Sequence, residues 1–283
     1  MEKLDTSMVK KIFTIPYFDK MIGMHSVPKS FLMCVKRYVK LENATVGEAI
    51  SEIYHRMERE YRNEYFYKNT ILNQLLLQKH DLYHTAALTE LPIGDSKADF
   101  IMINGRGVVY EIKTDLDNLL RNQIYDYYKV FSYVYVVAGK KQLPHVKEFL
   151  KDQKVGIYEL TESGRLICRK KARCNRDHLS YLVMFQVLRK PEFESILLKH
   201  FHKLPEVNSF QYYRESLKWL EKINIITLQK EVMECLKART LMSVEKKFEE
   251  QVPYELRFYA YFSKKLNSDY QKIDELCNAR MEG

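Results

Sequence analysis

Three charged residues near the middle of the chain have the types and spacing that phosphodiester hydrolysis requires. Asp99 stands at the start of one apolar run, and Glu111 and Lys113 stand two residues apart at the end of the next. Carboxylate oxygens are the ligands that Mg²⁺ prefers, and bound Mg²⁺ activates a water and neutralises charge on a phosphate. A neighbouring lysine can orient the water or stabilise developing charge. These residues predict a metal-dependent hydrolytic site.

Two predicted strands must bring the acids together. Residues 98–103 and 108–112 are strand-like runs, and the glycine-containing segment 104–107 between them is typical of a hairpin turn. Twelve positions separate Asp99 from Glu111 along the sequence. We expect the hairpin to place both carboxylates at the same end of a sheet.

The twofold periodicity of a strand fixes which side chains face the same way. Residues at i and i+2 share a face, so Glu111 and Lys113 are expected to project together. Ile112 should then point into the core, and its backbone carbonyl is a further candidate metal ligand.

A predicted helix follows the second strand. Residues 115–130 have helical spacing of apolar residues, and residues 133–138 form a buried-strand pattern. Strand, helix and strand in this order indicate a parallel crossover. Gln123 and Tyr127 lie four apart and share one helix face, from which we expect them to position the substrate or Lys113. A further strand is predicted at residues 155–160.

The regions on either side are predicted to be helical. Residues 1–76 have few strand signals, and Thr45 with Glu48 forms a capping-box pattern. Residues 179–281 show a continuous helical pattern. We therefore place a domain boundary near Asn175, which divides the chain into an α/β part with an N-terminal helical extension, residues 1–175, and an all-helical part, residues 176–283.

This region resembles the PD-(D/E)xK nuclease superfamily. The resemblance rests on Asp99, on Glu111-Ile112-Lys113, and on the QhxxY motif at Gln123-Ile124-Tyr125-Asp126-Tyr127. It spans about residues 61–160, and the QhxxY motif places it in the RecB-like branch, similar to a family of bacterial and phage-borne nucleases. Ala98 stands where the motif's name has a proline, which supplies no ligand.

The resemblance implies a fold, a cofactor and a substrate class. The fold would be a restriction-endonuclease-like αβββαβ core with a mixed sheet, preceded by N-terminal helices and followed by the helical C-terminal part. The cofactor would be Mg²⁺ or Mn²⁺ and the substrate a nucleic acid, with DNA favoured over RNA. Glu64, on a helix ahead of the sheet, would complete a metal site with Asp99, Glu111 and the Ile112 carbonyl. The catalytic set would be Asp99, Glu111, Lys113, Gln123 and Tyr127.

The charge balance agrees with a polyanionic partner. The formal net charge is +9 and the pI about 9.1, and excess positive charge favours association with nucleic acid. One segment, residues 164–176, contains basic residues and no acid. We expect it to contact phosphates, which would give salt-dependent binding without sequence specificity. Its candidate contact residues are Arg165, Arg169, Lys170, Lys171 and Arg173.

Other features of the sequence limit the class of protein to which the chain can belong. The five cysteines are scattered and form no C-x-x-C pair, so neither a zinc ribbon nor a redox dithiol is indicated. The first residues lack the apolar core of a signal peptide. No apolar run approaches the ~20 residues of a membrane span. A cytoplasmic protein without membrane association is expected.

Several alternatives stay open at the level of sequence. The charged residues could be a surface ion-pair cluster at strand ends, and the nuclease-like core could be a non-catalytic platform for nucleic acid or protein. An RNA-directed nuclease is a third possibility. The C-terminal helices could select substrate, bind a protein partner or mediate self-association. The resemblance also makes a role in a phage, mobile element or defence system plausible.

Overall fold

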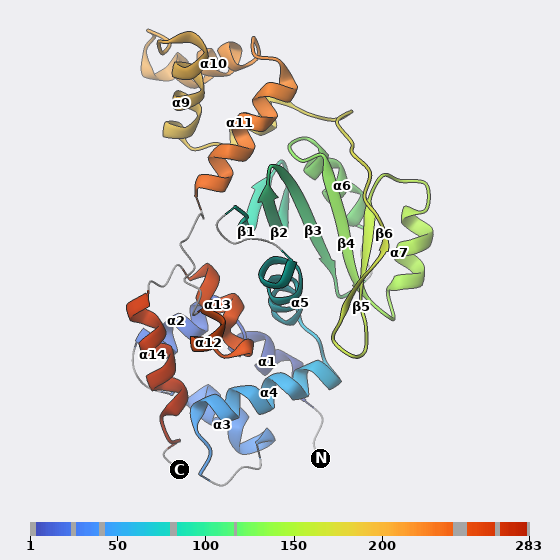
Figure 1. Ribbon diagram of the computed structural model, residues 1–283, viewed down its shortest axis with the longest axis vertical. Helices are drawn as coiled ribbons and strands as arrows, with labels where there is room; N and C mark the ends of the chain where they lie inside the picture. The colour runs from blue at the N-terminus through green and yellow to red at the C-terminus, as the bar shows by residue number, and fades with distance from the viewer. Residues whose placement is uncertain are drawn as a thin grey trace. The chain divides into compact units, whose positions relative to one another are not determined.

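The chain forms a mixed α/β structure in two compact units. The first unit comprises Met1–Lys79, Thr161–Leu166 and Val244–Gly283, and the second comprises His80–Leu160 and Ile167–Ser243. Figure 1 traces both units in a computed structural model. The structure describes residues 4–23, 27–39, 43–79, 84–115, 118–239, 248–263 and 267–281.

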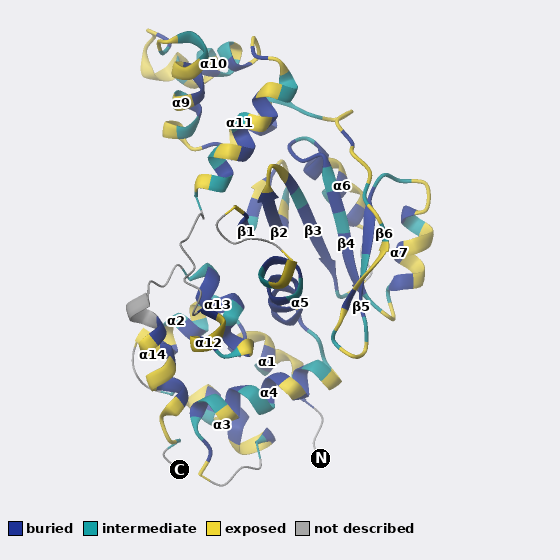
Figure 2. Cartoon of the chain, viewed as in Figure 1, coloured by how far each residue is buried: buried dark blue, intermediate teal, exposed yellow. Residues whose placement is uncertain are grey.

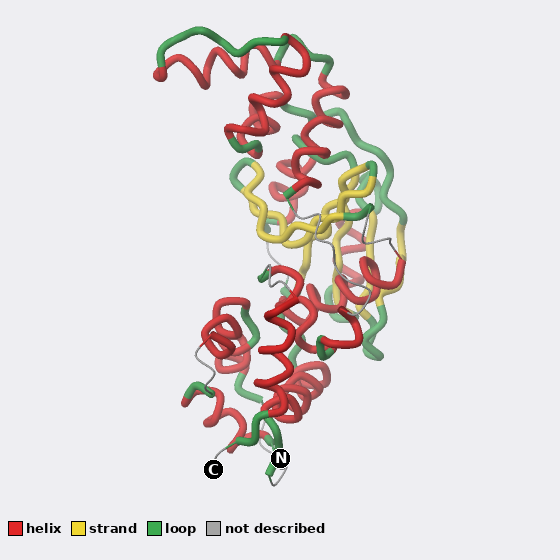
Figure 3. The backbone as a smooth tube through the Cα atoms, turned by 60° about the vertical axis from the view of Figure 1, so that its left-hand side comes forward, coloured by secondary structure: helices red, strands yellow, loops and turns green. Residues whose placement is uncertain are grey.

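A six-stranded sheet in sequential order β1-β2-β3-β4-β5-β6 is the centre of the second unit. Figure 3 shows its strands gathered in one twisted sheet. The strands are β1 (Ala86–Ile93), β2 (Ser96–Asn104), β3 (Arg106–Lys113), β4 (Tyr133–Gly139), β5 (Gly156–Leu160) and β6 (Leu166–Lys170). The helices of this unit are α6 (Leu120–Tyr128), α7 (Leu143–Leu150), α8 (Tyr181–Val187), α9 (Lys190–Phe201), α10 (Ser209–Leu220) and α11 (Ile225–Ala238).

Strand pairing confirms the predicted hairpin and the predicted crossover. β1 and β3 both pair antiparallel with β2, whereas β4 pairs parallel with β3 and with β5. Helix α6 makes the connection between β3 and β4, as expected. It begins at Leu120 and is shorter than the predicted helix at residues 115–130, of which residues 116 and 117 lie outside the described part of the chain.

One face of the sheet is the main hydrophobic core of the second unit. Alternate residues of the strands, such as Ile101, Val109 and Val134, are fully buried in a single cluster. Side chains of α6, α7, α8 and α11 belong to the same cluster, and Figure 2 shows the central strands β3 and β4 largely buried. Glu111 and Lys113 share the strand alternation of Val109, so they lie at the end of this apolar face.

The opposite face of the sheet carries a row of aromatic rings. Tyr110 stacks on Tyr135 with ring centroids 5.6 Å apart and an interplanar angle of 12°. Phe100 and Tyr158 extend the row on either side, at 6.4 Å from Tyr110 and 5.0 Å from Tyr135. Cross-strand aromatic pairs of this kind help to fix strand register, and register decides which charged residues meet.

Helix α11 is bound to the connection between α6 and β4 by a buried polar contact, and it also packs on the sheet through apolar side chains. The Gln229 side-chain amide donates to the Val130 carbonyl at 2.8 Å and to the Ser132 hydroxyl at 3.0 Å. A methyl group at Gly107 of β3 would lie within 2.5 Å of both Phe131 and the sulfur of Met233. A larger residue at this position would therefore require the side chains of Phe131 and Met233 to shift.

The two units divide the chain differently from the boundary predicted near Asn175. Helices α8 and α11 belong to the core cluster of the sheet, through residues such as Met184 and Val232. The last helices belong instead with the N-terminal ones, and the hydroxyl of Tyr65 donates to the Glu255 carbonyl at 2.8 Å. Helical periodicity shows that a face is apolar but does not show which partner covers it.

The described residues of the first unit are mainly helical, with an isolated bridge between Thr45 and Arg280. The Thr45 capping box is confirmed, because Thr45 accepts from the Glu48 amide at 3.2 Å and Glu48 accepts from the Thr45 amide at 2.8 Å. Its elements are α1 (Thr6–Ile12), α2 (Ile15–Gly23), α3 (Lys29–Tyr38), α4 (Val46–Glu60), α5 (Glu64–Ile71), η1 (Leu72–Leu77), α12 (Phe248–Gln251), η2 (Tyr254–Leu256), α13 (Arg257–Phe262) and α14 (Asn267–Asn278). Within the described ranges, no helix has the length and apolar character to cross a membrane.

Replacing Gln229 by alanine should destabilise the second unit. The change leaves the buried Val130 carbonyl without the Gln229 hydrogen bond, and an unsatisfied buried group costs about 1–3 kcal/mol. Denaturant unfolding of Gln229→Ala should show this loss, whereas Lys230→Ala, an exposed neighbour on α11, should stay within ~0.5 kcal/mol of wild type. Equal stabilities for the two variants would contradict the packing of α11 on the sheet.

Candidate active site

Three acidic residues lie in one row across the first three strands. The β1–β2 register pairs Thr89 with Phe100 and Leu91 with Ala98, which places Glu90 opposite Asp99. The β2–β3 register ends at the Phe100–Tyr110 pair, so Asp99 and Glu111 each stand one position beyond the paired residues of their strands. Directly opposite residues share a face, with Cβ atoms about 4.5–5.5 Å apart. The hairpin thus brings the predicted acids together and adds Glu90 to them.

Asp99 is anchored to the strand on each side. Its Oδ2 atom accepts a hydrogen bond from the Ile112 amide at 2.7 Å, and its backbone carbonyl accepts one from the Thr89 hydroxyl at 2.7 Å. Because both hydrogen bonds hold Asp99 at the end of the paired strands, its carboxylate keeps a fixed orientation toward β3.

Glu90 adopts a backbone conformation that is unusual for its residue type. Its φ is +58°, in the left-handed region, which costs a non-glycine residue about 1–2 kcal/mol. Its carboxylate forms an ion pair with Lys97 and has an oxygen within 4.8 Å of a carboxylate oxygen of Asp99. Two like charges at this separation repel unless a cation or proton lies close by.

Glu111 and Lys113 form a buried ion pair at the end of β3. The Lys113 Nζ atom lies 3.3 Å from Glu111 Oε1, and the exposed fractions of their side chains are 6% and 2%. The predicted shared face is therefore confirmed. Buried charges are tolerated when paired and hydrogen-bonded, so this pair requires further partners.

Helix α6 supplies those partners through the two residues of the QhxxY motif. The Tyr127 hydroxyl is 2.6 Å from Glu111 Oε2, to which it can donate, and the Lys113 ammonium donates to Gln123 Oε1 at 2.7 Å. Gln123 and Tyr127 are thus spaced so that one helix face meets both members of the ion pair. Burial, together with the nearby Glu111 carboxylate, raises the pKa of Tyr127 well above its ordinary value, so the phenol stays protonated.

Asp126 is a residue of the site region that the sequence alone did not single out. It is buried, its Oδ2 accepts from the Ser96 hydroxyl at 2.6 Å, and its Oδ1 pairs with Lys129 at 2.7 Å. Gly94 has φ +60°, and a Cβ there would come within 2.9 Å of Asp126 Oδ1. Asp126 thereby fixes α6 to the β1–β2 turn. The available signal in the sequence was an acidic residue inside an amphipathic helix, together with a turn of glycine and serine at a distant, earlier position in the chain.

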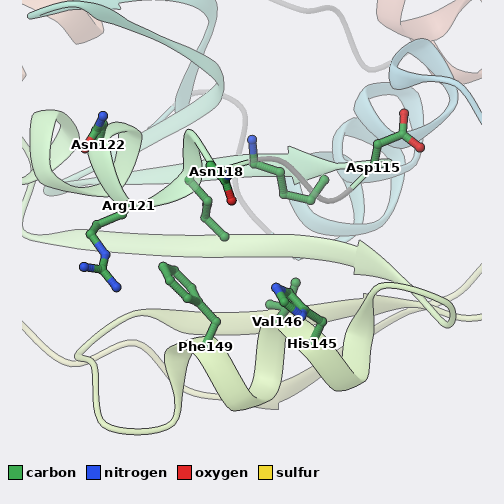
Figure 4. A pocket seen from close by; sticks show the side chains of 9 residues that line it. Asp115, Asn118, Arg121, Asn122, His145, Val146 and Phe149 are labelled. Carbon is green, nitrogen blue, oxygen red and sulfur yellow. The ribbon is translucent and has the colours of Figure 1, made fainter.

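A cavity of about 490 Å³ opens beside Lys113. Figure 4 shows it between residues that precede and begin α6 and residues of α7. Lys113 belongs both to the ion pair and to the lining of this cavity. The two features are therefore continuous.

Comparison with known proteins places the chain in a family. The family model of bacteriophage P4 protein cII matches residues 57–252, which is more than half of the chain. The chain belongs to this family. No curated protein matches it, and no solved structure does.

The residues matched by the P4 cII family model include all of the charged residues of the candidate site. Residues 57–252 contain Glu90, Asp99, Glu111 and the residues of α6 that hold Lys113. They also span the sheet and helices α8 to α11, so the family corresponds to the second unit and part of the first.

The donor set of this P4 cII family member fits a divalent cation. Metal–oxygen distances of about 2.0–2.6 Å put two oxygens that share an ion up to ~5 Å apart. The Glu90 and Asp99 oxygens fall within that span. Glu111, on the adjoining strand, is held by Tyr127 and Lys113, and its participation in binding the same ion stays a prediction. Ile112 is buried as expected, and a role for its carbonyl stays a prediction.

Glu64 belongs to the first unit, at the first turn of α5. Asn63 caps this helix by accepting from the Phe66 amide at 3.0 Å, and Glu64 forms an ion pair with Lys68. Its side chain is 55% exposed. The assignment of Glu64 to the metal site stays a prediction.

The basic segment is located at the opposite edge of the sheet from β1. Arg169 of β6 pairs with Glu159 at 2.6 Å, and the Lys170 ammonium donates to backbone carbonyls after α7, including that of Gln153 at 2.8 Å. Burial lowers the pKa of Lys170. These two residues hold the sheet edge, whereas Lys171 and Arg173 are exposed. Arg165 is exposed and belongs to the Thr161–Leu166 segment of the first unit.

The raised pKa of Tyr127 predicts a specific pH dependence. A tyrosine that stays protonated in the folded protein and ionises near pH 10 when unfolded contributes stability that is present below pH ~10 and lost above it. Above that pH, the unfolding free energy of Tyr127→Phe should fall less steeply than that of wild type, by about 1.4 kcal/mol per pH unit. Tyr125→Phe, on the exposed side of the same helix, is the matched control. Parallel curves for wild type and Tyr127→Phe would contradict the assignment.

Proposed function

We propose that this member of the P4 cII family is a metal-dependent nuclease with a restriction-endonuclease-like fold. The observation that carries the proposal is the close approach of the Glu90 and Asp99 carboxylates, with Asp99 hydrogen-bonded to β3 next to the buried Glu111–Lys113 ion pair. The element order from α5 through β1, β2, β3 and α6 to β4 agrees with the αβββαβ core that the sequence resemblance implies.

Each residue of the site would have a separate role in phosphodiester hydrolysis. Asp99 and Glu111, with Glu90 as a further donor, would hold Mg²⁺ or Mn²⁺, which when bound supplies an acidified water and charge neutralisation. Lys113 would stabilise negative charge that builds up on the phosphate. Its contact with Gln123 keeps the ammonium in place, and Tyr127 does the same for the Glu111 carboxylate. Preorganised charges of this kind need no rearrangement during the reaction.

The substrate class follows from charge and from analogy. The net charge of +9 favours a polyanion. DNA is proposed over RNA because most members of the resembled superfamily act on DNA, which is an argument by analogy. The family takes its description from a bacteriophage protein, which supports a role in a phage or mobile element.

Loss of Lys113 should strongly reduce cleavage, and unfolding curves of the variant serve as the check that it is folded under the assay conditions. Wild type should cut at least one of linear, circular or single-stranded DNA, or RNA, with Mg²⁺ or Mn²⁺ and not with EDTA. Lys113→Met keeps most of the side-chain volume and removes the charge, and we expect a rate lower by about a hundredfold or more. Lys151→Met, an exposed lysine on the same sheet unit, is the matched control. Absence of cleavage by folded wild type on every substrate would shift the assignment to a binding protein.

Metal affinity should depend on the acids of the row. Titration calorimetry with Mn²⁺ should show binding to wild type that Asp99→Asn weakens by about tenfold or more, since losing even an outer partner of a metal ligand costs about 10–100-fold. Glu90→Gln should weaken it in the same direction. Glu148→Gln changes an exposed acid of α7 and should leave the affinity unchanged. If Asp99→Asn and Glu148→Gln bind Mn²⁺ alike, the row is not the metal site.

A further inference from the structure

The cavity beside Lys113 has the size of a small-molecule site. Its volume of about 490 Å³ lies within the ~300–1,000 Å³ typical of ligand pockets. All of its lining residues belong to the second unit, so its shape is set within one compact body. They are Lys113, Asp115, Asn118, Leu120, Arg121, Asn122, His145, Val146 and Phe149.

The polar lining favours an anionic ligand with hydrogen-bonding edges. Arg121 and Lys113 are cationic, and His145 adds ring nitrogens that donate or accept. Asp115 is the acid among the lining residues, and Figure 4 shows its carboxylate turned away from Phe149 and His145. The Lys113 end of the cavity lies at the ion pair with Glu111, which marks the proposed site of hydrolysis.

The other wall of the cavity is a platform for a planar ring. Phe149 and His145 are four residues apart on α7 and therefore share one side of it. The Arg121 guanidinium lies over the Phe149 ring, 5.6 Å from its centroid, and Figure 4 shows the two side chains directed toward each other. Arg121 is exposed, so its guanidinium can shift to cover the second face of a ring that stacks on Phe149. Aromatic rings and arginine planes are the surfaces on which unpaired bases stack.

We infer that this cavity binds the unpaired base of a nucleotide whose phosphate lies beside Lys113. The inference rests on the proposed function, which identifies that phosphate as the one whose ester bond is hydrolysed. A base that occupies the cavity must leave the stack of a duplex. Single strands, frayed ends and flipped nucleotides are therefore the preferred substrates.

Binding of mononucleotides would distinguish the contribution of the base from that of the phosphate. Calorimetry on metal-free full-length protein would compare deoxyadenosine 5′-monophosphate, deoxyribose 5-phosphate and inorganic phosphate. We expect the nucleotide to bind at least about tenfold more tightly than the sugar phosphate, the size of effect typical of base stacking. Phe149→Leu, which keeps an apolar side chain and removes the ring, should abolish the difference. Phe210→Ala removes a 97% exposed aromatic ring of α10 that is not part of the cavity and should leave it intact.

The outcomes for the cavity and for the nuclease are distinguishable. Equal affinities for nucleotide and sugar phosphate, or an unchanged preference in Phe149→Leu, would overturn the base site even if the protein cleaves DNA. Base-dependent binding without cleavage would leave the cavity assignment standing and remove the nuclease. If both hold, Phe149→Leu should reduce cleavage of single-stranded DNA, and placing an abasic sugar next to the cut should reproduce that loss on wild type. Unfolding curves of both variants serve as the check on folding.

Discussion

A carboxylate and an ammonium are buried side by side at the end of β3, and much of the second unit is arranged to accommodate them. Charges with exposed fractions of 2% and 6% are stable only with good geometry and further hydrogen bonds. Gln123 and Tyr127 provide these bonds from one face of α6. Removing one partner from a buried pair costs about 3–5 kcal/mol. The position of α6, which supplies the hydrogen bonds, and the two charges at the end of β3 therefore depend on each other.

The position of α6 is in turn fixed from its other contacts. Asp126 attaches the helix to the β1–β2 turn through Ser96, and Gly94 provides the space for that carboxylate. On the far side, α11 packs against β3 and binds the end of the α6–β4 connection through Gln229. The helices of residues 181–238 therefore act as part of the scaffold of the sheet, in addition to any role in recognition.

The Glu90 backbone is strained where the acids converge. A left-handed non-glycine residue persists only when its surroundings hold it, and here the register on either side, at Thr89 and Leu91, does so. Its carboxylate lies close to that of Asp99. Such strain concentrates at functional positions, and the strained residue here is one of the acids proposed to bind the metal.

The sequence by itself determined the local elements and which side chains could meet along one element. The hairpin, the crossover and the shared face of Glu111 and Lys113 all follow from periods of 2 and 3.6 residues. The Gln123–Tyr127 spacing likewise indicated a helix face directed at the site. These are short-range properties, which residue type and spacing encode directly.

The tertiary structure decided what lies across from each element. It alone showed that Asp126 binds a turn thirty residues earlier through Ser96, and that Lys170 caps the end of α7. It also assigned α8 and α11 to the sheet and the last helices to the N-terminal unit. An apolar helix face or a charged side chain is compatible with many partners, and the choice among them depends on packing of the whole chain, which no local pattern contains.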